Sequence, residues 1–246
     1  MTQSTPDPAA GPTVVLIHGA FADSSSWNGV VERLQDAGVP VQAVSNPLRG
    51  ISHDSAYAAS AIRQIPGPVL AVGHSYGGAV ITNASPQTDN VVGLVFVAAF
   101  APDEGETLEG IENGSTDSVL NTALIPTQYP VGQDSETAVE LTVDPAKFHD
   151  AFASDVSVKE AAVMAATQRP VAAAAFGEPT GTPAWKTLPS WAVVPTGDKA
   201  AGSDVLRSMA QRAQATITET EGSHVIMVSQ PQIVTDVILQ ALEGIR

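Results

Sequence analysis

The sequence predicts one α/β domain built on a doubly wound, mostly parallel six-stranded sheet. Short runs rich in β-branched residues alternate with segments of helical periodicity, which is typical of strands joined by crossover helices. Several of these runs are apolar at every position, as expected of parallel strands covered on both faces. The 246 residues are 43% hydrophobic and 15% charged, so the chain can bury a core of this size.

The strand pattern occurs in six segments, which are 13–17 (TVVLI), 39–44 (VPVQAV), 68–73 (PVLAVG), 91–99 (VVGLVFVAA), 190–195 (SWAVVP) and 215–220 (ATITET). The helices predicted between and after them cover 24–37, 54–65, 203–213 and a segment that begins near Ser229. Gly38 and Pro66 end the first two helices, because glycine is favoured just after a helix and proline cannot continue one. Ser229 and Gln232 have the spacing of a capping box for the last helix.

The alternation stops between 103 and 187, where we predict a helical cap inserted after the fourth strand. This segment is rich in glycine, proline and acidic residues and contains no convincing strand pattern. Its later part predicts one helix with Asp144 as N-cap and Pro145 in the first turn. A second helix is opened by the capping box of Ser157 and Glu160. The expected division is a flexible N-terminal tail (1–12), an α/β core (13–102 and 188–246) and the helical cap (103–187).

The composition excludes several classes of function. A net charge of −15 with only 11 basic residues argues against a nucleic-acid partner, which would need clustered Lys and Arg. No apolar run reaches the roughly 18 residues of a membrane span, and the N-terminus lacks the basic and apolar regions of a secretion signal. The absence of cysteine excludes disulfides and Cys-ligated zinc. We therefore expect a cytoplasmic protein with no membrane partner and no metal site.

The residues GHSYGG, 73–78, lie between the third predicted strand and a helical pattern. This is the context of the G-x-S-x-G nucleophile elbow, in which a serine stands on a strained strand-to-helix turn. Gly73 and Gly77 would allow the tight packing of strand against helix. The N–H of Tyr76, at the helix N-terminus, would be free to bind an oxyanion. We therefore predict that Ser75 is a nucleophile and not an incidental serine in a glycine-rich turn.

A serine nucleophile needs a base and an orienting acid, which in this architecture follow it in the order acid, then histidine. His149 falls in the predicted cap, whereas His224 follows the last predicted strand, so we predict His224 as the base. Asp198 follows the fifth strand and Asp103 follows the fourth. We favour Asp198 as the acid for its spacing to His224, and Asp103 remains the alternative.

The loop after the first strand, HGAFADSSSW (18–27), is expected to supply a second oxyanion donor. A sharp turn at His18 and Gly19 would aim the N–H of Ala20 at the same point as that of Tyr76. The N–H of Phe21 is the alternative if the register differs by one residue.

The segments HGAFADSSSW, GHSYGG, TGDKA and GSHVIMVSQP together resemble the α/β-hydrolase family. They are most similar to bacterial relatives of the plant methylesterases and hydroxynitrile lyases. The resemblance runs from Val14 to the C-terminus and implies a cofactor-free hydrolase with a six-stranded parallel sheet and a small helical cap. By motif, it implies a catalytic triad of Ser75, Asp198 and His224. It also implies an oxyanion hole formed by Ala20 and Tyr76.

Two positions depart from the lyase branch of that family. The hydroxynitrile lyases carry threonine where Gly19 stands and lysine where Val225 stands. Those groups orient a cyanohydrin and stabilise cyanide, so their absence argues against lyase chemistry. The methylesterase pattern HGACHGGWSW shares only its frame with this chain, so no hormone ester follows from it.

The sequence thus predicts a serine hydrolase that acts on a small carboxylic ester without a cofactor. Phe21, Met164 and Trp185, with the ring of Tyr76, are candidate walls of an apolar substrate pocket. For Met164 and Trp185, which lie in the predicted cap, ordinary packing within the cap is at least as good an explanation. The same triad could serve an amide, a lactone, a carbon–carbon bond or perhydrolysis, and a receptor with slow turnover is a further alternative. The sequence is compatible with a homodimer as well as with a monomer.

Overall fold

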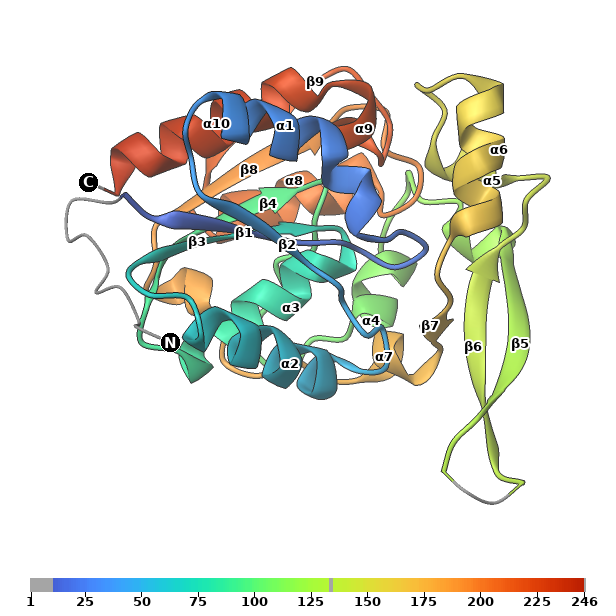
Figure 1. The fold of residues 1–246 in the computed structure, drawn as a ribbon. Coiled ribbons are helices and arrows are strands. Elements are labelled where there is room, and N and C mark those ends of the chain that lie inside the picture. Colours follow the sequence, from blue (N-terminus) through green and yellow to red (C-terminus); the bar gives the residue numbers. More distant parts are fainter. Residues whose placement is uncertain (1–10, 133–134, 246) are drawn as a thin grey trace, which may run out of the picture.

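The computed structural model describes residues 11–132 and 135–245, and the predicted tail therefore falls outside it except for residues 11 and 12. A six-stranded sheet forms the centre of the molecule, and a second, smaller sheet stands to one side of it (Figure 1). The large sheet has the order β2-β1-β3-β4-β8-β9, and all of its neighbouring strands are parallel.

The core strands lie where the apolar runs predict them, with ends shifted by at most two residues. They are β1 (Thr13–Ile17), β2 (Val41–Val44), β3 (Val69–His74), β4 (Val91–Val97), β8 (Ser190–Pro195) and β9 (Thr216–Thr220). Every residue of β3 and β8 is buried, whereas the edge strands β2 and β9 are partly exposed. The prediction of a six-stranded parallel sheet is confirmed.

Helices cover both faces of this sheet. They are α1 (Asn28–Asp36), α2 (Ile51–Arg63), α3 (Tyr76–Ala84), α8 (Ser203–Arg212), α9 (Ile226–Ser229) and α10 (Pro231–Gly244), with short 3₁₀ turns at Ser24–Trp27 and Ser85–Gln87. The helix α1 packs against α10 on one face, and α2 packs against α3 on the other (Figure 1). Within the described ranges, no helix is both long and apolar enough to cross a bilayer.

The insertion (103–187) is not purely helical, and the prediction was wrong on this point. Its helical elements are α4 (Leu108–Asn113), α5 (Phe148–Phe152), α6 (Val158–Thr167), α7 (Ala174–Gly177) and 3₁₀ turns at Leu120–Thr122 and Ala184–Lys186. It also contains an antiparallel sheet of β5 (Leu124–Pro130), β6 (Thr137–Val143) and β7 (Val171–Ala172). Pro126 and Pro130 obscure the strand pattern, but β5 is an edge strand, where proline is tolerated.

Of the three predicted helix caps, one is found. Ser157 is the N-cap of α6 and accepts a hydrogen bond from the N–H of Glu160 at 3.2 Å. Asp144 instead closes a turn upstream of α5, accepting from the N–H of Ala146, because the helix itself begins only at Phe148. The capping box at Ser229 is also wrong: α10 starts after Gln230, and the Ser229 hydroxyl binds a carboxylate of the insertion.

Candidate active site

Ser75 stands on the turn between β3 and α3 in a strained backbone conformation, with φ 52° and ψ −123°. Such a conformation costs a non-glycine residue about 1–3 kcal/mol, and it persists only where the surroundings impose it. The neighbouring glycines impose it here. A Cβ at Gly73 would lie 2.5 Å from the carbonyl oxygen of Gly77, and one at Gly77 would overlap the carbonyl oxygen of Ile17. The sequence thus builds a tight elbow that presents the serine.

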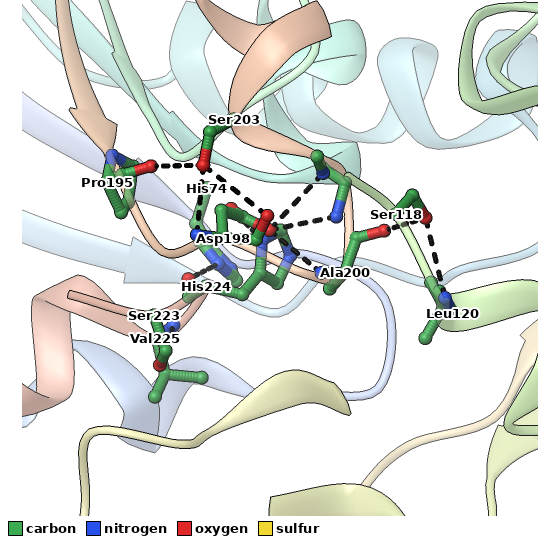
Figure 2. Close-up of polar contacts among 12 residues, drawn as sticks. His74, Ser118, Leu120, Pro195, Asp198, Ala200, Ser203, Ser223, His224 and Val225 are labelled. Atoms are coloured by element: carbon green, nitrogen blue, oxygen red, sulfur yellow. Dashed lines mark hydrogen bonds and ion pairs between the residues drawn. The ribbon is translucent and has the colours of Figure 1, made fainter. Parts of the chain in front are cut away.

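Asp198 and His224 meet at the same edge of the sheet, because Asp198 follows β8 and His224 follows β9 (Figure 2). The Nδ1 atom of His224 lies 2.6 Å from Oδ2 of Asp198, and both side chains are buried. The other carboxylate oxygen accepts hydrogen bonds from the N–H groups of Ala200 (2.9 Å) and Ala201 (3.0 Å). Asp198 is therefore fixed in orientation and holds His224 through Nδ1.

His74, the residue before the serine, is fully buried and contacts the His224 segment. Its Nε2 lies 2.9 Å from the backbone oxygen of His224, and the two rings are 4.8 Å apart between centroids. Burial lowers the pKa of His74 well below its usual value, so the ring is neutral and donates through Nε2–H. This contact was not predicted from the sequence. The position of His74 inside the elbow motif was the feature that could have indicated it.

The structure places the other two candidates away from this pair. Asp103 lies at the start of the insertion, where its carboxylate is 2.5 Å from the Lys186 ammonium. The hydrogen bond from Lys186 holds the pKa of Asp103 below its usual range. His149 lies on α5 and pairs with its own neighbour, Asp150. The geometry therefore favours Asp198 over Asp103 as the partner of His224.

The backbone of the loop after β1 lies directly against the elbow. A Cβ at Gly19 would be 2.7 Å from the Cβ of Ser75, so this approach requires glycine. His18 fixes the loop: its Nδ1–H donates to the Gly19 carbonyl, and its Nε2 accepts from the N–H of Asn46, both at 2.9 Å. Burial lowers the pKa of His18, which keeps the ring neutral in this role.

The two residues predicted to supply oxyanion donors each follow one residue of this contact in the chain: Ala20 follows Gly19, and Tyr76 follows Ser75. Ala20 is buried. Tyr76 is the first residue of α3, so its N–H has no acceptor within the helix. The Tyr76 hydroxyl instead donates to Oδ2 of Asp54 at 2.8 Å, so the phenol tip is tied to α2.

Phe21 and Met164 line the same hollow, of about 200 Å³, between the β1 loop and α6. The Phe21 ring packs edge-on against Phe152, whose ring in turn packs edge-on against His224 with centroids 4.9 Å apart. Trp185 lies apart from them. It lines a separate hollow with Ser190, the first residue of β8, because the chain returns there to the amino end of that strand.

The sequence model of the Alpha/beta hydrolase family matches residues 14–237, and no curated protein matches the chain at a significant level. Similar solved structures include polyneuridine aldehyde esterase, with a TM-score of 0.77, 20% identity and coverage of 94% of this chain and 99% of that one. The methylesterase MES16 from Arabidopsis has a TM-score of 0.76, 19% identity and coverage of 95% and 99%. A pyrethroid hydrolase from Sphingobium faniae JZ-2 has a TM-score of 0.73, 19% identity and coverage of 95% and 98%. These structures share the fold, and because the family's sequence model spans both parts of the core, the chain belongs to the alpha/beta hydrolase family.

Proposed function

We propose that the protein is a serine hydrolase that cleaves a small carboxylic ester through an acyl-enzyme. Two observations carry this proposal: a serine held in a strained strand-to-helix turn, and a buried Asp198–His224 pair whose histidine contacts His74, the residue before that serine. Strain of this kind clusters at functional sites, because a fold retains it only where something depends on the geometry. Membership of the family supports hydrolase activity, and several structures of the same fold are esterases.

In the first half of the reaction, Ser75 Oγ attacks the ester carbonyl carbon while Nε2 of His224 takes the hydroxyl proton. The carbonyl π electrons move onto oxygen, and the tetrahedral intermediate forms. When it collapses, the bond to the leaving alcohol breaks and His224 returns the proton to the alkoxide. Asp198 keeps the imidazole tautomer fixed throughout and stabilises the imidazolium without taking its proton.

In the second half, His224 removes a proton from water as the water attacks the acyl-Ser75 carbonyl. The carboxylic acid then leaves, and the proton on His224 returns to Ser75 Oγ. The N–H groups of Ala20 and Tyr76 would hold the oxyanion in both steps. Each such donor is worth on the order of 10²–10³ in rate, because it is in place before charge develops.

The Gly19 position supports ester hydrolysis over cyanohydrin cleavage. The lyases that the sequence resembles need a threonine side chain there, but a Cβ at Gly19 would collide with the Cβ of Ser75 and with Nδ1 of His74. The position after His224 holds Val225, which is buried and carries no charge for a cyanide ion.

The hollow between the β1 loop and α6 is linked to His224 through aromatic packing, since Phe21 lines it and packs on Phe152, which contacts His224. Its lining combines the apolar side chains of Phe21 and Met164 with polar ones such as Glu160. About 200 Å³ is less than the roughly 300–1,000 Å³ of a pocket for a drug-sized ligand, so a short acyl or alcohol chain fits better than a long one.

Turnover of p-nitrophenyl esters with acyl chains of graded length tests the proposal. Ser75→Ala should lower kcat by a factor of about 10⁴ or more, because no other group forms the acyl-enzyme. Ser208→Ala, which removes an exposed hydroxyl from α8, is the matched control and should leave the rate unchanged. Undiminished activity of Ser75→Ala would disprove the nucleophile. If the protein turned over no ester but did turn over an amide, a lactone, a carbon–carbon substrate or peroxide, the triad would act on that other bond. Tight ligand binding without turnover would favour a receptor.

A further inference from the structure

One buried carboxyl group has no place in the reaction above. Glu112, on α4 of the insertion, is only 5% exposed, and its single hydrogen-bond partner among the described residues is the Ser118 hydroxyl, 3.2 Å from Oε1. A buried carboxylate normally gathers several donors or a cation, because burial removes its hydration. Among the described residues, Glu112 has one such partner and no cation, which favours the neutral carboxylic acid.

The hydrogen bonds of Ser118 lead to the same conclusion. Its hydroxyl carries one hydrogen, and the Ala200 carbonyl oxygen, 2.6 Å away, is the nearer acceptor for it (Figure 2). The hydroxyl oxygen can then only accept from Glu112, and acceptance requires that the carboxyl group be protonated. The backbone N–H of Leu120 also approaches the hydroxyl oxygen, at 3.4 Å.

Ser118 and its neighbour hold the loop that carries the acid of the site. Besides the bond to Ala200, the N–H of Val119 donates to the Lys199 carbonyl at 2.8 Å. The N–H of Ala200 in turn donates to Asp198 Oδ1 at 2.9 Å. The insertion thus binds the 198–201 loop at two successive carbonyl groups, those of Lys199 and Ala200.

The surroundings of Glu112 favour the neutral form. Burial is the largest cause that raises the pKa of Glu112 to about 7; the negative charges of Asp198 and Glu109 act in the same direction, and the charge of His224 acts against them. Glu109 is on the same helix, whereas Asp198 and His224 face Glu112 from the two catalytic loops. The helix α7, which also packs against α4, has no ionisable side chain.

We propose that Glu112 is a positioning residue of the catalytic acid, which acts as a proton donor to Ser118 and so keeps Ser118 bound to the Ala200 carbonyl. This role rests on the proposed ester hydrolysis. A deprotonated Glu112 can only accept hydrogen bonds, so the single hydroxyl hydrogen of Ser118 must then serve either the carboxylate or Ala200. The grip on the Asp198 loop therefore weakens as the pH rises through neutrality.

The variant Glu112→Gln tests this role, because its amide has the same shape and donates to Ser118 at every pH. We expect kcat of Glu112→Gln to match that of the wild type at pH 6 and to exceed it about threefold at pH 8.5, where only the wild type has lost the donor. Glu104→Gln, which changes an exposed carboxylate of the insertion, should follow the wild type across the range. Ser118→Ala should lower kcat about tenfold at all pH values with little change in KM, and adding Glu112→Gln to it should have no further effect.

Thermal unfolding gives a readout that does not depend on the reaction. Because the pKa of Glu112 is raised above the usual value of 4.5, its contribution to stability is fully present below that value and is lost as pH rises to about 7. The Tm of Glu112→Gln minus that of the wild type should therefore increase by about 5 °C between pH 5 and pH 8. A constant difference would show that Glu112 holds no extra proton and would overturn the proposal.

A ratio of kcat values that stays flat with pH would also overturn it, even if the Tm difference changes, because the proton would then have no link to Asp198. Failure of the proposed function is distinguishable from both outcomes. In that case Ser75→Ala would keep its ester turnover, while the Tm difference would still report on the proton of Glu112.

Discussion

The core and the insertion hold the site in different ways. In the core, the geometry around Ser75 is set by backbone: the glycines of the elbow press against main-chain atoms, and every residue of β3 is buried. The insertion instead reaches the loops that carry Asp198 and His224 through single polar side chains. Ser118 binds the Asp198 loop, Asp155 binds the His224 loop, and Glu178 binds the start of α2.

This difference suggests that the core backbone sets the geometry that the reaction requires, whereas the side chains of the insertion adjust its rate. Backbone packing has no alternative arrangement at low cost, because protein interiors are close-packed. A polar tether between two segments can break and form again at a cost of about 1–2 kcal/mol. Changes in the core should therefore remove activity, and changes in the insertion should reduce or retune it.

The largest expected effect is on kcat and distinguishes Asp198 from Asp103, the two candidates for the acid that orients His224. Asp198→Asn, in the core, should lower kcat by about 10⁴, because the amide cannot hold the reactive tautomer of His224. Asp103→Asn, in the insertion, removes only a surface pair with Lys186 and should leave kcat within about twofold. Ester turnover by the two variants at pH 8 measures both. A larger loss for Asp103→Asn would contradict the assignment of the acid.

An intermediate effect is expected at Asp155, between α5 and α6. Its carboxylate accepts from the N–H of Ser223 (2.8 Å), from the Ser223 hydroxyl and from the Ser229 hydroxyl (2.7 Å). These donors flank His224, so the side chain ties the insertion to the histidine loop. Asp155→Ala should lower kcat about tenfold and the free energy of unfolding by about 1 kcal/mol, since the carboxylate is exposed.

Asp150→Ala is the matched control for that variant. Asp150 is another acidic residue of the insertion with a side chain that is 91% exposed, and among the described residues its carboxylate pairs with its neighbour His149 alone. It should change neither kcat nor stability. If the two alanine variants behave alike, the tether has no effect on His224, and the insertion would act only by covering the site.

The same contrast explains what could be predicted from sequence. The strands β1 and β8 were predicted at their observed bounds. A short run that is apolar at every position is typical of a parallel strand buried on both faces. The strained turn at Ser75 was predictable because its glycines are adjacent in sequence. The pairing of Asp198 with His224 followed from the rule that the carboxyl ends of parallel strands share one edge of the sheet.

The contacts of the insertion escaped prediction because their partners are distant in sequence and their signals are weak. Asp155 and Ser223 are 68 positions apart, and nothing in the local pattern of either residue indicates the other. The strands β5 and β6 are half exposed, so burial imposes little pattern on them. Glu112 looks like an ordinary exposed residue of a short acidic helix until the fold buries it.

The smallest effect is expected at Glu178, where the insertion meets α2. Its carboxylate accepts from the N–H groups of Ile51 (2.6 Å) and Ser52 (3.1 Å), in the first turn of this helix. Glu178→Gln keeps one acceptor oxygen, loses the other together with its hydrogen bond, and removes the attraction of the carboxylate to the helix dipole. Urea unfolding should show a loss of about 1 kcal/mol, part of which disappears in 1 M salt, because salt screens the attraction to the dipole. Glu32→Gln, at an exposed site on α1, should show no such loss. A loss above about 2 kcal/mol would mean that the insertion is held to the core as firmly as the core is held together, and the contrast between the two regions would fail.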